Sequence, residues 1–128
     1  GVYEGQPVLD ADGLFGQVTS VEPYYSWVQL ITDSQHATPV QVNRNGVRAV
    51  VSGTQGSQHE MIMNNMTDTA DIEVGDVLVT SGLGQRFPAG YRVGVITSIV
   101  RDPGQPFARV TVVPTAKLDS SRNLLLVF

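Results

Sequence analysis

The hexapeptide GQVTSV at residues 16–21 is nearly repeated as GVITSI at residues 94–99. Its glycine, threonine and serine are identical in the two copies, and its third and sixth positions are apolar in both. Around each copy the chain shows the same order of elements, with one short apolar segment before it and two after it. A shared order of this kind is typical of an internal duplication. It predicts two related units of about four strands each.

The rest of the chain favours strands over helices. Val, Ile and Thr, which pack well on a pleated sheet, make up 35 of the 128 residues, and there are 13 Gly and 7 Pro to form turns. We therefore expect an all-β protein, and a helix bundle is excluded. Alternating or apolar segments bounded by turn residues predict strands. They cover residues 6–10, 14–21, 27–32, 38–43, 47–52, 60–64, 76–81, 91–100, 107–113 and 124–128.

The polar, acidic segment at residues 67–74 suggests a boundary between the two units. We expect a first unit over residues 1–66 and a second over residues 67–128. The hairpin at residues 47–64 has no counterpart in the second half and could close either unit. Units of about 60 residues are marginally stable alone, so we expect the two to share an interface.

Charge and composition exclude several classes of function. The net charge is −4, from 12 acidic and 8 basic residues, so a basic face for nucleic acid is not expected. The absence of cysteine excludes a disulfide framework, a thiolate metal site and a cysteine nucleophile. No apolar run is long enough to span a bilayer. The chain opens at Gly1 without a signal peptide and resembles a piece of a longer protein.

The residues that could carry catalysis do not form a convincing set. The two histidines, His36 and His59, lie in turn regions and are expected at the surface, without a metal. A Ser-His-Asp triad could draw on His36, Asp76 and Ser98, but Ser98 falls within a regular strand rather than on a strained turn. Gly82-Leu83-Gly84 is not followed by a helix that could cradle a phosphate. We expect no cofactor and no catalytic residue.

Large apolar side chains are more informative, because two groups of them fall in turns. Such residues often anchor protein–protein contacts, although they can equally cap the ends of a barrel. The candidate partner-binding residues are Tyr24, Tyr25, Trp27, Leu83, Phe87 and Tyr91.

Residues 75–90, GDVLVTSGLGQRFPAG, continue into YRVGVI and resemble the signature of the rod shape-determining protein MreC family. Further pieces agree with this resemblance, which covers essentially the whole chain and is closest in loop length to proteobacterial members. They are GQPV at 5–8, GLFGQV at 13–18, PVQV at 39–42, PTA at 114–116 and LLLV at 124–127.

The resemblance implies a fold and a role that composition does not show. It implies two small six-stranded β-barrels packed together, loosely like the halves of trypsin-like proteases but without a catalytic triad. The repeat accounts for four strands per unit and a hairpin, fewer than two sets of six. The resemblance also implies a non-enzymatic scaffold of the elongasome. It places this chain in the periplasm, as the exported part of a single-pass inner-membrane protein. Its implied partners are penicillin-binding protein 2, MreD, RodA, MreB and further copies of itself.

Two alternatives remain open beside this reading. One is a hydrolase resembling the two-barrel serine proteases, and the other is a module whose main partner is itself. Serine close to a histidine would favour the first, and concentration-dependent association would favour the second.

Overall fold

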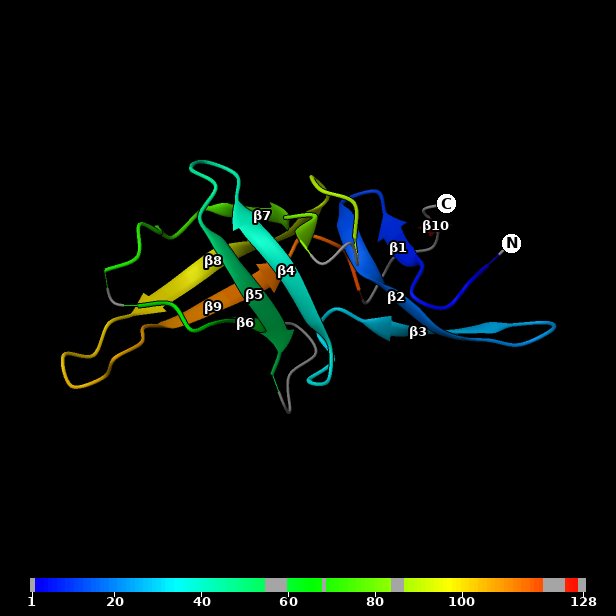
Figure 1. The fold of residues 1–128 in the computed structure, drawn as a ribbon, viewed down its shortest axis with the longest axis horizontal. Helices are drawn as coiled ribbons and strands as arrows, with labels where there is room; N and C mark the ends of the chain where they lie inside the picture. Colours follow the sequence, from blue (N-terminus) through cyan, green and yellow to red (C-terminus); the bar gives the residue numbers. More distant parts are fainter. Residues whose placement is uncertain (1, 55–59, 68, 84–86, 119–123, 127–128) are drawn as a thin grey trace.

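The computed structural model describes residues 2–54, 60–67, 69–83, 87–118 and 124–126 (Figure 1). Each of the ten segments expected to form a strand overlaps one, and the described residues form no α-helix. The strands are β1 (Pro7–Asp10), β2 (Gly13–Val21), β3 (Ser26–Leu30), β4 (Ala37–Val42), β5 (Arg48–Gly53), β6 (Met61–Asn64), β7 (Val77–Thr80), β8 (Arg92–Val100), β9 (Arg109–Pro114) and β10 (Leu125–Leu126).

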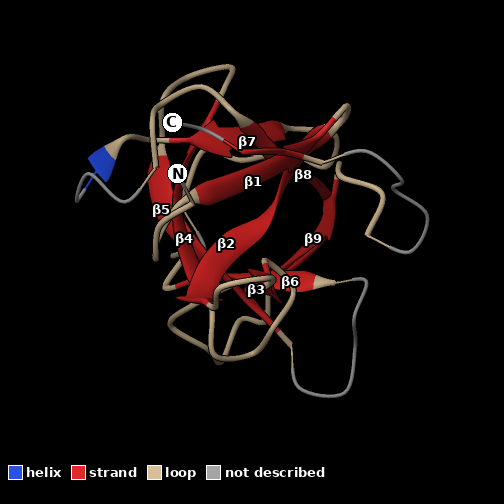
Figure 2. Ribbon diagram, turned by 90° about the vertical axis from the view of Figure 1, so that its right-hand side faces the viewer, coloured by secondary structure: helices blue, strands red, loops and turns tan. Residues whose placement is uncertain are grey.

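The strands form two antiparallel assemblies. Six of them close a barrel in the order β4-β5-β6-β9-β8-β7, and the other four form a sheet in the order β10-β1-β2-β3. Figure 2 shows β1, β2 and β3 lying in front of the barrel. The expected all-β class is therefore confirmed, with one closed barrel. In the described residues the other assembly is a four-stranded sheet rather than a second closed barrel.

Strand pairing divides the chain differently from a boundary at residue 66. The hairpin β5–β6 pairs with β4 on one side and with β9 on the other, so it closes the barrel. A cut between residues 66 and 67 would separate β6 from β9 and β4 from β7. The reason is that the barrel needs strands from both halves of the chain to pair all its edges.

The repeated hexapeptide corresponds to a repeated structure. β1-β2-β3 and β7-β8-β9 have the same pairing, with Val8 opposite Gly16 in one and Leu78 opposite Gly94 in the other. The register also shifts at the same place, beside Thr19 in β2 and beside Thr97 in β8. A β-bulge of this kind bends a strand and increases its twist. The repeat therefore specifies the same bent three-stranded unit twice.

The fourth strand of each repeat pairs with the other repeat. β4, which follows the first three-stranded unit, pairs with β7, and β10, which follows the second, pairs with β1. The positions correspond, because Val42 lies opposite Leu78 and Leu126 lies opposite Val8. The two units thus exchange their fourth strands, and the shared interface expected from their small size is partly backbone pairing.

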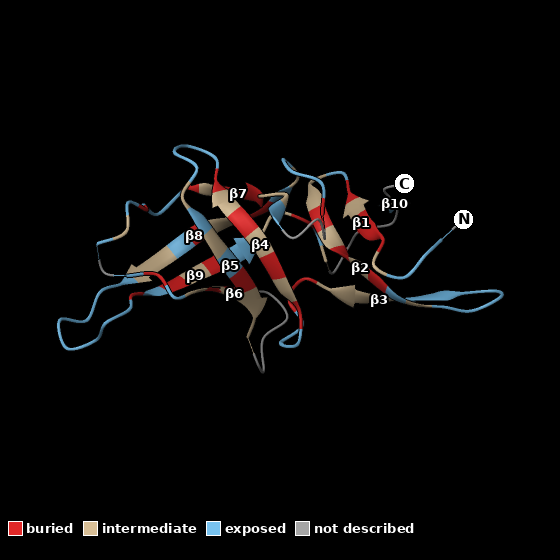
Figure 3. Ribbon diagram, in the orientation of Figure 1, coloured by how far each residue is buried: buried red, intermediate tan, exposed pale blue. Residues whose placement is uncertain are grey.

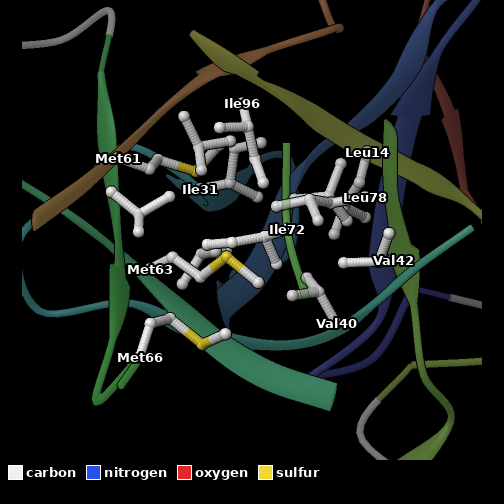
Figure 4. Packing of buried hydrophobic residues seen from close by; sticks show 14 of the residues in the cluster. Leu14, Ile31, Val40, Val42, Met61, Met63, Met66, Ile72, Leu78 and Ile96 are labelled. Carbon is white, nitrogen blue, oxygen red and sulfur yellow. The ribbon is translucent and has the colours of Figure 1, made fainter. Parts of the chain in front are cut away.

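Side chains alternate between the interior and the surface along most strands, as Figure 3 shows for β4 and β2. The interior of the barrel is filled by aliphatic and methionine side chains, which Figure 4 shows pointing toward one another. Leu14 and Ile31, from the sheet side, belong to the same core cluster, so one core serves both assemblies. The labelled members are Leu14, Ile31, Val40, Val42, Met61, Met63, Met66, Ile72, Leu78 and Ile96.

Candidate functional site

The hairpin between β2 and β3 carries the first group of candidate residues. β2 extends well beyond the core, and Pro23 ends it because proline cannot donate to a strand ladder. The turn is closed by the Glu22 amide, which donates to the Tyr25 carbonyl at 2.8 Å. In Figure 1 this hairpin projects from the right-hand side of the molecule, and Figure 3 shows its outer part exposed. It is therefore a surface that a partner can reach.

Three aromatic side chains cover this hairpin and are open to solvent. Tyr24, Tyr25 and Trp27 are 97%, 60% and 62% exposed. Tyr25 directly precedes β3 and Trp27 lies two residues further on, so in extended backbone their side chains point to the same side. Their rings meet edge to face, with centroids 6.1 Å apart and an interplanar angle of 85°. Exposed aromatic rings gathered in this way form an apolar patch of the type found at contact hot spots. We call Tyr24, Tyr25 and Trp27 the hairpin patch.

The second group of candidates does not form a comparable patch. Leu83 is exposed and Tyr91 is half-buried, whereas Phe87 is only 3% exposed and belongs to the core cluster. Phe87 is therefore unsuited to be a surface anchor in this conformation. Its ring lies against that of His36, with centroids 6.0 Å apart. For Phe87 the alternative expectation, that turn residues cap the end of a barrel, is the one that the structure supports.

His36 is buried, contrary to the expectation of a surface loop. It is 2% exposed, and its Nε2 lies 3.2 Å from Gln17 Oε1 while its Nδ1 lies 3.2 Å from Thr38 Oγ1. Gln17 lies on β2 of the sheet and Thr38 on β4 of the barrel. The imidazole therefore bridges the two assemblies through polar contacts that compensate for its burial. His59 lies outside the described residues.

Of the other members of the candidate triad, Ser98 lies within β8 opposite Thr111, as a regular strand residue, and Asp76 is held by an arginine. Arg44 Nε and Nη2 donate to the two carboxylate oxygens of Asp76 at 3.0 and 3.1 Å. This hydrogen bonding by Arg44 is the main cause that holds the pKa of Asp76 below its usual range, against the opposing effect of burial. The same pairing raises the pKa of Arg44. Asp76 also accepts from the Glu73 amide at 2.8 Å, so this carboxylate fixes the turn before β7.

No grouping of metal-binding side chains occurs in the part of the chain that the structure describes. A shallow hollow of about 410 Å³ lies where the β1–β2 turn meets the start of β8. Its main carboxylate, Asp10, is already used, since its oxygens accept from the amides of Asp12, Gly13 and Lys117. The hollow is thus a junction between the units, and its main carboxylate is not available to a ligand.

The described residues also contain no helix of the length and hydrophobicity that a membrane span requires.

Sequence reasoning did not single out the exposed aromatic residue Phe107. Phe107 is about half exposed and lies on the β8–β9 hairpin, which is the structural counterpart of the β2–β3 hairpin. In Figure 1 the two hairpins reach out from opposite ends of the molecule. The repeat could have revealed this equivalence, because it aligns β8 and β9 with β2 and β3.

Comparison with known proteins agrees with the sequence resemblance. The family model described as "Rod shape-determining protein MreC, barrel core" matches residues 1–128. The cell shape-determining protein MreC of Haemophilus influenzae is 48% identical over 128 residues, which is 100% of this chain and 36% of that protein. The chain thus spans about a third of the length of such a relative.

Solved structures show the same fold. The crystal structure of MreC from Pseudomonas aeruginosa is 57% identical with a TM-score of 0.94, covering 99% of this chain and 81% of that one. A complex between penicillin-binding protein PBP2 and MreC from Helicobacter pylori contains a chain with 24% identity and a TM-score of 0.76, covering 98% of this chain and 80% of that one. At that identity the likeness concerns the fold alone. The family match over every residue, with these relatives, shows that the chain belongs to the rod shape-determining protein MreC family.

Proposed function

We propose that this chain is a periplasmic protein-binding scaffold that holds and positions a peptidoglycan synthase, penicillin-binding protein 2, during growth of the cell wall. The family is one of cell shape-determining proteins rather than of enzymes, which leaves the hydrolase alternative without support. MreD, RodA and MreB are proposed as further members of the complex, and self-association as an additional property. The MreC of the Helicobacter pylori complex is described as bound to PBP2, which supports the choice of partner.

The hairpin patch is the observation that carries this proposal. A single aromatic residue at a surface is common, but three adjacent ones on a projecting hairpin expose an apolar area that water solvates poorly. Tyr and Trp also lose little conformational entropy on binding, because each has only two side-chain torsions. The described residues offer no competing cluster of side chains that could hold a metal ion. Recognition of a protein surface is thus the chemistry that these residues support best.

A scaffold of this kind can act on its partner only through preferential contact. If the partner exists in two conformations, binding favours the one that fits the hairpin patch better. The gain in the synthase's activity is then limited by the difference in affinity between the two conformations.

The test is the affinity of this chain for the soluble periplasmic part of penicillin-binding protein 2, measured by calorimetry or interferometry. We expect the double variant Tyr25→Ala/Trp27→Ala to bind at least about 10-fold more weakly, as removal of hot-spot aromatics typically does. Phe107→Ala is the matched control, because it removes an exposed aromatic from the equivalent hairpin at the opposite end. Equal loss in both variants, or no binding by the unaltered chain at tens of micromolar, would contradict the proposal.

A further inference from the structure

The outer edge of β3 is open, whereas the corresponding edge of the barrel is covered. β3 is the last strand of its sheet, and in the described parts of the chain no strand pairs with its second edge. Its counterpart in the repeat, β9, pairs on that edge with β6. An open edge presents unpaired N–H and C=O groups that can template another strand. The internal repeat therefore shows what a filled edge looks like on the same framework.

The correspondence between β3 and β9 holds residue by residue. Val28 lies opposite Val18 as Val112 lies opposite Ile96, and Trp27 and Thr111 follow in equivalent places. The Thr19 hydroxyl donates to the Trp27 carbonyl, and the Thr97 hydroxyl donates to the Thr111 carbonyl, at 3.4 Å in each case. The backbone of β3 is thus shaped like that of β9.

Hydrogen-bond direction indicates which groups of β3 face outward. The Ile31 amide donates to the Phe15 carbonyl of β2, at 3.2 Å. Because alternate residues of an antiparallel strand point to the same neighbour, the amides of Ser26, Val28 and Leu30 face away from β2. The barrel obeys the same rule. There the Thr115 amide donates to the Val93 carbonyl at 3.2 Å, and the outward residues Val110 and Val112 lie opposite Met63 and Met61 of β6.

We propose that the edge of β3 binds an extended segment of another protein as an added antiparallel strand, in the place that β6 occupies beside β9. Addition of a strand to an open edge is a recurring mode of peptide recognition. β6 indicates the side chains that fit, because its alternate residues Met61 and Met63 are fully buried. The bound segment therefore carries apolar side chains at alternate positions.

Charge defines the flanks of this segment. Residues 1–43 include five acidic residues and no lysine or arginine. Two of the acidic residues, Glu22 and Asp33, are exposed and lie just before and just after β3. Lysine or arginine beside the apolar core of the segment complements them and aids encounter. A second copy of this chain fits less well, because antiparallel pairing of two β3 edges places Glu22 of one copy near Asp33 of the other.

The inference rests on the proposed role as a protein-binding scaffold, but it concerns the backbone edge of β3 and not the identity of the partner. Its test uses a synthetic probe, a peptide with the β6 residues MIMN between two lysines at each end. We expect saturating peptide to slow amide hydrogen exchange at Ser26, Val28 and Leu30 by at least about fivefold. The amides of Trp27 and Gln29, which face β2, should change little. This alternation distinguishes strand addition from contact with side chains alone.

Three controls sharpen the result. The same peptide with N-methyl groups on its two methionines, whose counterparts Met61 and Met63 lie opposite the outward residues of β9, cannot pair and should give no protection. Val28→Pro removes one outward amide without removing a bond to β2, so the protein should remain folded by circular dichroism and lose the peptide. Glu22→Lys should weaken the lysine-flanked peptide but not a serine-flanked one.

Protection that is absent, or uniform along β3, or confined to the barrel would overturn the inference, as would protection of β3 by self-association without peptide. The inference and the proposed function fail separately. Peptide protection without binding of penicillin-binding protein 2 removes only the choice of partner. Binding of that protein without protection of the outward amides removes only the strand-addition mode.

Discussion

Gly16 and Gly94 begin the two copies of the repeated hexapeptide, and each lies where a neighbouring strand passes too close for a side chain. A Cβ on Gly94 would lie 2.6 Å from Val112 Cγ1 and 2.7 Å from the Val113 carbonyl oxygen. A Cβ on Gly16 would collide with the Gln29 carbonyl oxygen. Backbone atoms cannot move aside as a flexible side chain can. These contacts are a physical reason for glycine at the first position of both copies.

We expect Gly94→Ala to lower the free energy of unfolding by about 1–3 kcal/mol, the range typical of overpacking. Gly104→Ala is the control, because its Cβ would meet nothing closer than Asp102 Oδ1 at 3.9 Å, and it should change stability by less than about 0.5 kcal/mol. Urea denaturation followed by circular dichroism measures both. Equal stability of the two variants would show that β8 and β9 can separate without cost.

The pairing of Asp76 with Arg44 makes stability depend on acid. The folded-state pKa of Asp76 is lowered, chiefly by the hydrogen bonds from Arg44, below the value of about 3.9 of an unfolded chain. Its contribution is therefore complete above that value and is lost as the pH falls through the folded pKa. We expect Asp76→Asn to reduce stability at pH 7 and to flatten the loss of stability below pH 4.

Asp71→Asn provides the comparison for that titration. Asp71 lies 3.4 Å from the same arginine but is well exposed, so solvent screens its interaction. The Asp71→Asn variant should keep a stability at pH 7 close to that of the unaltered chain. Denaturation midpoints measured from pH 2 to pH 7 separate the two variants. An unchanged acid limb in Asp76→Asn would assign the acid sensitivity to other carboxylates.

At the scale of elements, local pattern was sufficient to place the strands but not their partners. Alternation and turn residues located all ten segments, and the hexapeptide repeat located two bent strands that share one bulge position. The exchange of β4 and β10 could not be predicted, because a strand's own sequence does not say which edge it will join. The burial of His36 could not be predicted for the same reason, because its partners Gln17 and Thr38 come from different assemblies.

The candidate site was predicted in part. The hairpin patch was recognisable because Tyr24, Tyr25 and Trp27 follow a proline that ends a strand, and the structure exposes all three. Phe87 is also aromatic and also lies in a turn next to a proline, yet its side chain packs inward against His36. Only tertiary packing separates these two outcomes.

The exchanged strand β10 is short, yet it covers the edge of β1. Its pairs are Val8 with Leu126 and Leu9 with Leu125. We expect deletion of residues 124–128 to accelerate amide exchange in β1 by at least about tenfold, because its edge becomes open to solvent. Leu125→Lys is the control: its side chain is already exposed, so the backbone pairing and the protection of β1 should persist. Unchanged exchange after the deletion would show that β10 does not protect β1.

At the scale of the whole molecule, the exchange makes the two units depend on each other. The barrel takes β4 from the first repeat, the sheet takes β10 from the second, and the core cluster includes Leu14 from the sheet. Neither repeat can form all its backbone pairs alone, because β4 of the first pairs with β7 and β10 of the second pairs with β1. This mutual dependence agrees with the marginal stability of units of this size. It also gives a rigid base to the hairpin patch and the β3 edge, which lie on the smaller assembly.

We therefore expect the chain to unfold as one cooperative unit. Methyl resonances of Val8 in the sheet and Met63 in the barrel should lose their native signals at the same urea concentration, with the same dependence on urea. A fragment of residues 1–66 should remain unfolded under native conditions, because β4 loses β7 and β6 loses β9. Two separated midpoints, or a fragment with dispersed resonances, would mean that the sheet and the barrel are independent domains. In that case a partner bound at the β3 edge could not stabilise the barrel. With cooperative unfolding, the same partner stabilises the whole chain by mass action.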